Sequence, residues 1–266
     1  MASILKFFSF LFIINASSLV LTTCGAAPTH SPTIHSHKAA ILSGLDTMRH
    51  FFIQRPWILD VYNHIALSPS DRQVFSKTLQ GVSAVGSQMR NGAAGSWSNG
   101  VAVLIEDYKG HKASDVVAKA MMEPFENGYA EVKALRTFSD LYIDSGMVSG
   151  WPSANPSPVL LMKKVPGQPI RSCREYRMAS TEQRTAIHTT LQKMVCSQVV
   201  KWALEHRLLF ADLHQGNIMV VMEGTTVKSM QIIDFGYPGI FTVTANAKED
   251  DIQSWCLARF ADKWVM

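Results

Sequence analysis

The chain has 266 residues, of which 47% are hydrophobic and 17% are charged, and its formal net charge at pH 7 is +4. A chain of this length can bury one ordinary hydrophobic core or two small lobes. The charge is mild and the sequence has no run of Lys and Arg residues, so we do not expect nucleic acid to be a partner.

The N-terminus has the layout of a secretory signal peptide. Lys6 precedes an apolar run from residue 7 to residue 21, and small residues follow before Pro28. The alternative is a membrane anchor, but the run is shorter than the roughly 20 residues that a spanning helix needs. We therefore expect residues 1–27 to be removed as a signal peptide. The mature chain would then be secreted, outside the cell or in the secretory lumen, with no stable membrane anchor.

Residues 28–38 contain Pro, Thr, Ser and three His residues with almost no apolar side chains. This composition predicts a disordered leader. Three cysteines remain beyond the signal peptide, namely Cys173, Cys196 and Cys256. Because three is odd, at most one intrachain disulfide can form.

Two helices are expected after the leader. Apolar residues recur at helical spacing from residue 39 to residue 52. The stretch Ser68-Pro69-Ser70-Asp71 then has the signals of a second helix start, with Ser as the N-cap, Pro at the first helical position and an acid in the first turn.

Residues 81–105 predict a strand, a glycine-rich loop and a second strand. The loop contains Gly95 and Gly100, and small residues let backbone N–H groups approach phosphate oxygens closely. Residues 115–122 predict a further strand, in which Lys119 interrupts an apolar run. A lone lysine in such a strand ordinarily points to solvent.

The rest of the chain divides into clear segments. Residues 130–138 predict a helix, and residues 144–158 predict a loop because they are rich in Gly, Pro and Ser. A strand follows at residues 159–162. Apolar residues at helical period predict one long helix over residues 181–206. Glu249 begins a last helix with acids in its first turn.

Residues 208–237 hold two polar clusters between apolar strands. Asp212 and Asn217 form the first cluster and Asp234 belongs to the second. A turn at residues 223–226 predicts a hairpin that would bring the two clusters to the same end. Carboxylate and amide oxygens gathered there suit a hard cation such as Mg²⁺. Taken alone, each Asp at a strand end is a turn residue or a helix cap.

The spacing D-x-x-x-x-N, followed by I-D-F-G across a hairpin, resembles the catalytic loop and the metal loop of the protein-kinase-like fold. The form A-D-L-H-Q-G-N-I is closer to the aminoglycoside phosphotransferase and choline kinase branch, although Phe210 and Ala211 replace the residues that precede the Asp there. The resemblance implies an α+β, two-lobed kinase-like domain over residues 39–266. N-terminal helices and a small β-rich nucleotide lobe would occupy residues 39–162, and a truncated, mostly helical catalytic lobe residues 163–266.

The resemblance also implies roles for the polar clusters. Asp212 would be the catalytic base that accepts a proton from a substrate hydroxyl. Asn217 and Asp234 would hold Mg²⁺ (or Mn²⁺) across the phosphates of ATP. His214 is either a structural hydrogen-bonding residue or a group that helps to place the metal loop. Asp251, at the start of the last helix, would brace the catalytic loop.

ATP binding is implied for a second set of residues. Lys119 resembles the lysine of the V-A-I-K strand, which neutralises the phosphates during catalysis. Glu131 is its candidate partner, and Glu126 is a rival because the spacing from Lys119 to Glu131 is short. The glycine loop aligns less well: Gly95 and Gly100 match the phosphate-binding pattern, whereas Trp97 takes the place of its middle glycine.

The sequence therefore predicts a secreted, Mg²⁺-dependent, kinase-like phosphotransferase. It would move the γ-phosphate of ATP to a hydroxyl of an unknown protein or small molecule. The alternative is a catalytically weak or inactive kinase-like binding module, which the departures at Trp97, Phe210 and Ala211 favour. Transfer of AMP instead of phosphate stays open on sequence alone.

Overall fold

The computed structural model describes residues 55–61, 67–82, 98–122, 126–152, 154–236 and 239–264. All of these residues belong to one compact unit that begins at Phe52. The expected signal peptide, the leader, the first helix at residues 39–52 and Gly95 lie outside the described residues.

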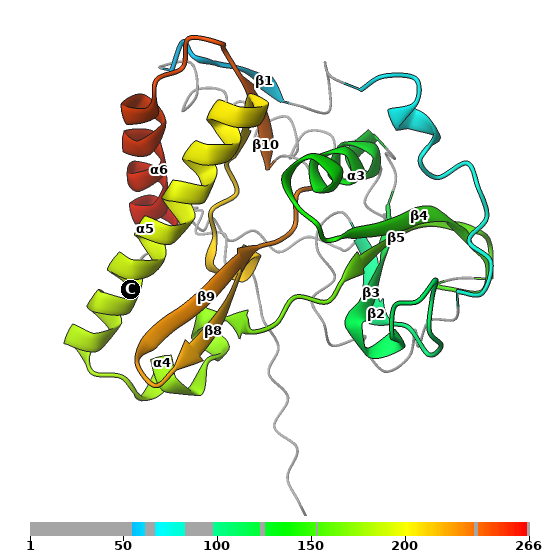
Figure 1. The fold of residues 1–266 in the computed structure, drawn as a ribbon, viewed down its shortest axis with the longest axis horizontal. Coiled ribbons are helices and arrows are strands. Elements are labelled where there is room, and N and C mark those ends of the chain that lie inside the picture. The colour runs from blue at the N-terminus through cyan, green and yellow to red at the C-terminus, as the bar shows by residue number, and fades with distance from the viewer. Residues whose placement is uncertain are drawn as a thin grey trace, which may run out of the picture. The chain divides into compact units, whose positions relative to one another are not determined.

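A four-stranded antiparallel sheet forms the β-rich N-terminal lobe (Figure 1). Its hydrophobic core includes Ala118, Val159 and Leu161, which are fully buried. The strands, in sheet order, are β2 (Ser98–Val103), β3 (Val116–Met121), β5 (Ser157–Lys163) and β4 (Tyr142–Val148).

Strand β4 corrects the prediction of a loop from residue 144 onward. Asp144 and Ser145 read as turn residues in the sequence, yet both are buried within β4. Ser145 pairs with Leu160 of β5, and its hydroxyl donates to the Val74 carbonyl at 2.8 Å. Distant partners satisfy these polar groups, and for this reason a strand forms where the local pattern predicts a loop.

Residues 67–82, called here the strap, run beside β4. The predicted helix start at Ser68 is present only as a single turn, the 3-10 helix η1 (Asp71–Gln73). The Ser68 hydroxyl does accept from the Asp71 N–H at 3.2 Å, as an N-cap does. The expectation of a full helix is wrong, because the chain leaves the turn to form a parallel bridge between Thr78 and Met147.

Helix α3 (Glu126–Phe138) begins four residues earlier than the pattern predicts. Its buried side includes Ala130, Glu131, Ala134 and Leu135. A buried glutamate on an otherwise apolar helix face requires a partner, and the site supplies one.

Two helices dominate the C-terminal lobe. Helix α5 (Thr181–His206) has the predicted bounds and begins with a capping box between Ser180 and Gln183. Helix α6 (Glu249–Lys263) packs side by side with α5 (Figure 1). A disulfide between Cys196 and Cys256 joins them, with their Cα atoms 5.6 Å apart, and Cys173 is free and buried.

The predicted hairpin is confirmed, with Ile218 paired to Ile232. It belongs to a three-stranded sheet of β6 (Gln168–Pro169), β8 (Ile218–Glu223) and β9 (Thr226–Ile232). A second three-stranded sheet contains β1 (Ile58–Val61), β10 (Ile240–Val243) and β7 (Leu208–Phe210). The short helices are η2 (Ala113–Asp115), η3 (Ile170–Ser172), α4 (Arg174–Met178) and η4 (Gln215–Asn217).

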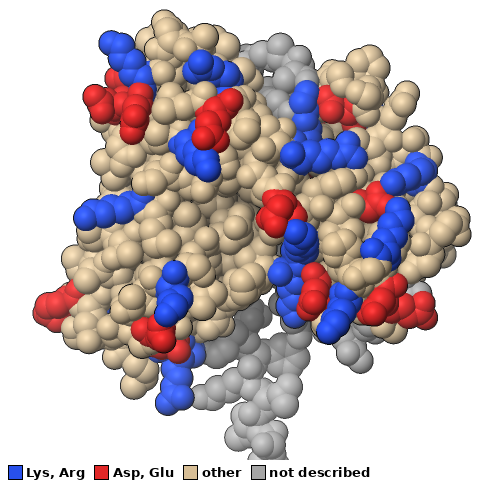
Figure 2. Space-filling model, in the orientation of Figure 1, with Lys and Arg blue, Asp and Glu red and all other residues tan. Residues whose placement is uncertain are grey.

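Basic and acidic side chains are interspersed on the face drawn in Figure 2. This mixture is typical of a solvated surface that carries no strong field of one sign. Among the described helices, none has the length and apolar character required to cross a bilayer. The mixture of helices and sheets agrees with the predicted α+β fold.

Candidate active site

The catalytic-loop residues and the metal-loop residue meet at one end of the β8–β9 hairpin. Asp212 and Asn217 lie between β7 and β8, and Asp234 lies just beyond β9. The Ile233 N–H donates to the Asn217 carbonyl at 2.9 Å, which joins the two loops. The hairpin geometry thus places all three polar side chains at the end predicted from the sequence.

Asn217 is held in one orientation by Asp212. Its Nδ2 donates to the Asp212 carbonyl at 3.1 Å and to the Asp212 Oδ2 at 2.9 Å, and the side chain is buried. With the amide nitrogen committed to Asp212, the Oδ1 of Asn217 is the atom that can serve a metal ion.

Lys119 connects the two lobes. Its Nζ lies 2.7 and 2.9 Å from the two carboxylate oxygens of Glu131 and 2.7 Å from the Asp234 Oδ1. Lys119 does not point to solvent, since both it and Glu131 are buried. Glu126, the rival partner, instead pairs with Arg72 at 3.1 Å. Lys119 therefore binds α3 on one side and the metal loop on the other.

The charge states follow from this arrangement. Burial acts to lower the pKa of Lys119, but Glu131 and Asp234 outweigh burial and raise this pKa above its ordinary value. Burial acts to raise the pKa of Asp234, but Lys119 outweighs it and holds this pKa below the usual range. Near neutral pH the site thus presents a charged ammonium and a charged carboxylate side by side.

Asp234 and Phe235 lie in the metal loop, shortly after β9. Asp234 has a φ of 62°, a left-handed conformation that is uncommon outside glycine. The next ring, Phe235, is buried and contacts three aromatic rings, with centroids 5.5 to 5.7 Å away. These rings belong to α3, β7 and α5, and they are Phe138, Phe210 and Trp202. Phe210 thus fills apolar space against the metal loop.

Helix α6 braces the catalytic loop through residues that sequence reasoning missed. The Arg259 Nε donates to the Ala211 carbonyl at 3.3 Å, and the Trp264 Nε1 donates to the Leu213 carbonyl at 2.6 Å. These two carbonyls flank Asp212. The prediction that Asp251 braces the loop is wrong, because Asp251 is exposed in the first turn of α6.

His214 lies beside the candidate base in a fixed orientation. Its Nδ1 accepts from the Gly216 N–H at 3.0 Å, and its Nε2 lies 3.6 Å from the Asp212 Oδ2. A Cβ at position 216 would come within 2.8 Å of the His214 ring. Since Nδ1 is an acceptor, the neutral ring carries its proton on Nε2, toward Asp212. This contact supports the structural interpretation of His214.

The donor set fits a magnesium ion held jointly with phosphates. Asn217 and Asp234 offer hard oxygen ligands, and Mg²⁺ typically takes one or two carboxylates together with waters and substrate phosphates. The described residues contain no group of three or more His, Cys, Asp or Glu side chains that would hold a metal alone. Of the predicted phosphate-loop glycines, only Gly100 is described; its φ is 136°, and a Cβ there would meet no atom within 4 Å.

Part of this layout matches a known protein family. A family model described as the ABC1 atypical kinase-like domain matches residues 152–262. No curated protein matches the chain. Similar solved structures include the bifunctional kinase-methyltransferase WbdD (14% identity, 57% of this chain and 42% of that chain covered, TM-score 0.32) and the BubR1 kinase domain (14%, 80% and 62%, 0.38). The match thus spans less than two thirds of either of those chains.

The family match covers the catalytic loop and the metal loop, whereas Lys119 and Glu131 lie upstream of it. The element order from β2 to α6, the buried pair of Lys119 and Glu131, and the hairpin that joins Asn217 to the metal loop are together the arrangement of a kinase. The family match over residues 152–262 and this geometry support a place for the chain in the protein-kinase-like superfamily.

Proposed function

We propose that this chain is a Mg²⁺-dependent (or Mn²⁺-dependent) phosphotransferase that moves the γ-phosphate of ATP to a hydroxyl of a protein or a small molecule. One observation carries the proposal: Lys119 contacts both Glu131 and Asp234 at hydrogen-bonding distance. The ion pair between such a lysine and a helix glutamate is one of the contacts that a kinase must have in place before it acts on ATP.

Each residue has a defined task in this proposal. Asn217 and Asp234 would hold the metal ion, which neutralises charge on the phosphates when it is bound. Lys119 would bind the α- and β-phosphates, and Asp212 would accept the proton of the attacking hydroxyl. Asp212 is suited to this role because its side chain is about one third exposed, which leaves it accessible to an acceptor. Catalysis would rest on positioning and electrostatics.

Metal-dependent nucleotide binding is the first test. We expect ATP with Mg²⁺ to raise the thermal midpoint of the wild-type protein, and ATP without Mg²⁺ to raise it much less. Asp234→Ala removes the charged metal ligand and should abolish the Mg²⁺-dependent part. Absence of any Mg²⁺-dependent shift in the wild type would reject the enzyme proposal.

Phosphotransfer is the second test. Intact-mass measurement after incubation with ATP should show additions of one phosphate by autophosphorylation, and additions of AMP would identify the other transfer reaction. Asp212→Asn should lower the rate by about 100-fold or more, the range of a general base. An unchanged rate in Asp212→Asn would contradict the role of this residue.

A kinase-like binding module without turnover is the second candidate. The burial of Phe210 against Phe235 favours it, because an apolar ring stands where the family has a polar residue before the catalytic loop. One result would distinguish the two candidates: nucleotide binds with Mg²⁺, but no phosphate is transferred or released. That result would favour the binding module.

We further propose that the protein is secreted. The layout of residues 1–27 supports this, and the disulfide between Cys196 and Cys256 fits an oxidising compartment. Expression with the native N-terminus in a secretory host should give a mature protein in the medium that begins close to Pro28. Retention in the cytosol with both cysteines reduced would contradict the proposal.

A further inference from the structure

The strap packs along the outer side of the helix that carries Glu131. The Asp71 Oδ2 accepts from the Lys133 Nζ at 2.8 Å, and the Phe75 ring lies 5.8 Å from the Tyr129 ring. A Cβ at Gly128 would come within 3.1 Å of the Phe75 ring, so the glycine permits this close approach. The strap therefore contacts the first two turns of α3 through an ion pair and through close packing of the Phe75 ring.

The other end of the strap is joined to β4 by backbone hydrogen bonds. The Leu79 N–H donates to the Met147 carbonyl at 2.9 Å, and the Met147 N–H donates to the Lys77 carbonyl at 2.8 Å. A Cβ at Gly146 would stand 2.5 Å from the Lys77 carbonyl oxygen, so β4 has a glycine where the strap comes nearest. Leu79 is buried in the core of the sheet.

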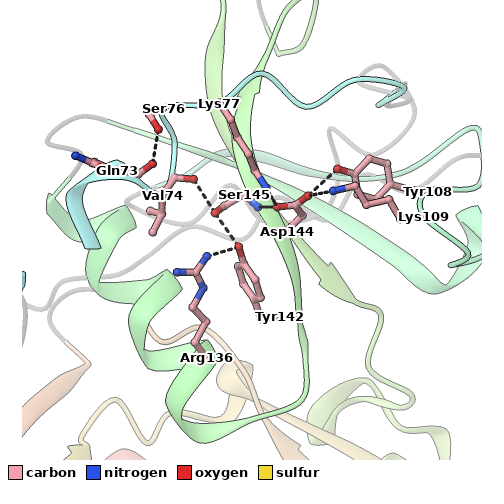
Figure 3. A network of polar contacts seen from close by, with 10 residues as sticks. All are labelled: Gln73, Val74, Ser76, Lys77, Tyr108, Lys109, Arg136, Tyr142, Asp144 and Ser145. Carbon is pink, nitrogen blue, oxygen red and sulfur yellow. Dashed lines mark hydrogen bonds and ion pairs between the residues drawn. The ribbon is translucent and has the colours of Figure 1, made fainter. Parts of the chain in front are cut away.

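A buried carboxylate secures the same segment (Figure 3). Asp144 on β4 accepts from Lys77 of the strap, from the Tyr108 hydroxyl at 2.8 Å and from the Lys109 Nζ at 2.8 Å. Asp144 is 4% exposed. The strap is thus fixed to the sheet at one end and to α3 at the other.

Glu131 lies on the opposite side of α3 from two of these contacts, those made by Tyr129 and Lys133. Tyr129 and Lys133 are each two residues from Glu131, which corresponds to roughly 200° around an α-helix. Through Tyr129 and Lys133 the strap therefore presses on the helix from the side away from Lys119, whereas the Gly128 contact lies roughly 60° from Glu131. A helix held in this way keeps Glu131 at Lys119.

We propose that the strap is a positioning element for Glu131, with Asp71 and Phe75 as its positioning residues. It keeps α3 in the position that forms the pair between Lys119 and Glu131, so that the ATP half of the site assembles without a partner chain. The proposal rests on the proposed function for its effect on ATP, but the effect on α3 is independent of it.

The test is a charge swap between strap and helix. Asp71→Lys and Lys133→Asp are made singly and together, and two quantities are measured: the Kd for ATP with Mg²⁺ and hydrogen exchange of the amides in residues 126–138. Each single variant should weaken ATP binding by about three- to tenfold, the usual range of a pairwise coupling, and should speed exchange in α3. The double variant should restore both.

Asp140→Lys is the matched control. Asp140 pairs with Lys163 at the same 2.8 Å, and neither residue belongs to the strap. It should leave ATP affinity and the exchange of α3 unchanged. The proposal is overturned if the single variants lower the thermal midpoint while Kd and exchange stay at wild-type values, or if the double variant restores neither.

The two proposals fail in different ways. If the wild type binds no ATP with Mg²⁺, the proposed function is lost, and the exchange of α3 alone decides on the strap. Faster exchange in both single variants with recovery in the double variant supports it, and unchanged exchange overturns it.

Discussion

Two helices hold the two halves of the candidate site, and they are held by different forces. Helix α6 is joined to α5 by a buried disulfide and reaches the catalytic loop through the buried side chains Arg259 and Trp264. Helix α3 is joined to the strap by ion pairs in contact with water and by the Phe75 ring, which packs against Tyr129 and Gly128. The side chains of Lys133 and Asp71 are 27% and 17% exposed, and those of Arg72 and Glu126 are 47% and 48% exposed.

This difference predicts unequal rigidity. Exposed ion pairs contribute little and are screened by salt, whereas a buried donor or acceptor that loses its partner costs about 1–3 kcal/mol. The half of the site that holds the candidate base should therefore be stiff, and the half that holds Lys119 and Glu131 should be adjustable. The predictions below test that contrast.

The largest effect is expected at Trp264. Its ring stacks on Phe260 at 4.1 Å, and its N–H holds the Leu213 carbonyl. Trp264→Ala should lower the free energy of unfolding by about 3–5 kcal/mol. Trp264→Phe keeps most of the ring contact and removes the donor, so it should cost about 1–3 kcal/mol. Denaturant unfolding measures both values, and a Trp264→Phe variant as stable as the wild type would show that the hydrogen bond to the catalytic loop contributes nothing.

A smaller loss is expected when the strap is displaced from β4. In Gly146→Ala the new methyl group meets a backbone carbonyl that cannot rotate away, and we expect a cost of about 1–3 kcal/mol from overpacking. Limited proteolysis should then cut within residues 67–82 earlier than in the wild type, while α6 stays protected. Protection of the strap equal to that of the wild type would contradict the tight approach of Lys77 to Gly146.

The local sequence pattern predicted those helices and strands whose stabilising contacts are between residues near in sequence. The helix over residues 181–206 has its apolar stripe and its capping box within its own sequence. The hairpin of β8 and β9 carries its turn signal between two apolar runs, which is why Asp212, Asn217 and Asp234 were expected together. Lys119 and Glu131 were expected through the family resemblance, and the structure pairs them.

Elements that depend on distant partners could not be predicted in this way. Asp144 and Ser145 form a strand because the strap and the turn at Tyr108 satisfy them, and the pattern within β4 contains no sign of those partners. Trp264 braces the catalytic loop through one N–H. A buried Trp ordinarily finds a partner for this group, but the sequence does not say which carbonyl receives it.

The smallest effect is expected on lowering the pH. Acid should weaken the half of the site that holds Lys119 and Glu131 and leave the other half intact. Burial acts to raise the pKa of Asp144, but hydrogen bonds from Lys109, Lys77 and Tyr108 outweigh burial and hold this pKa far below its usual range. The unfolded chain has an Asp pKa of about 3.9. The stability contributed by Asp144 is therefore present above that value and is lost as the pH falls toward the folded pKa. The pKa of Asp71 is also lowered, because its hydrogen bonds to Lys133 and Ser68 outweigh its burial. Its contribution to stability is therefore lost in acid as well.

Hydrogen exchange compared between pH 7 and about pH 3, which lies below the unfolded pKa, measures this loss after correction for the intrinsic rates. Amides of α3 should lose protection in acid, while those of α6 keep theirs, because the disulfide that joins α6 to α5 does not titrate. Asp144→Asn should be less stable than the wild type at pH 7 and should show a shallower further loss at low pH. Parallel losses in α3 and α6 would mean that one cooperative unit holds both halves, and the contrast between the two helices would then be wrong.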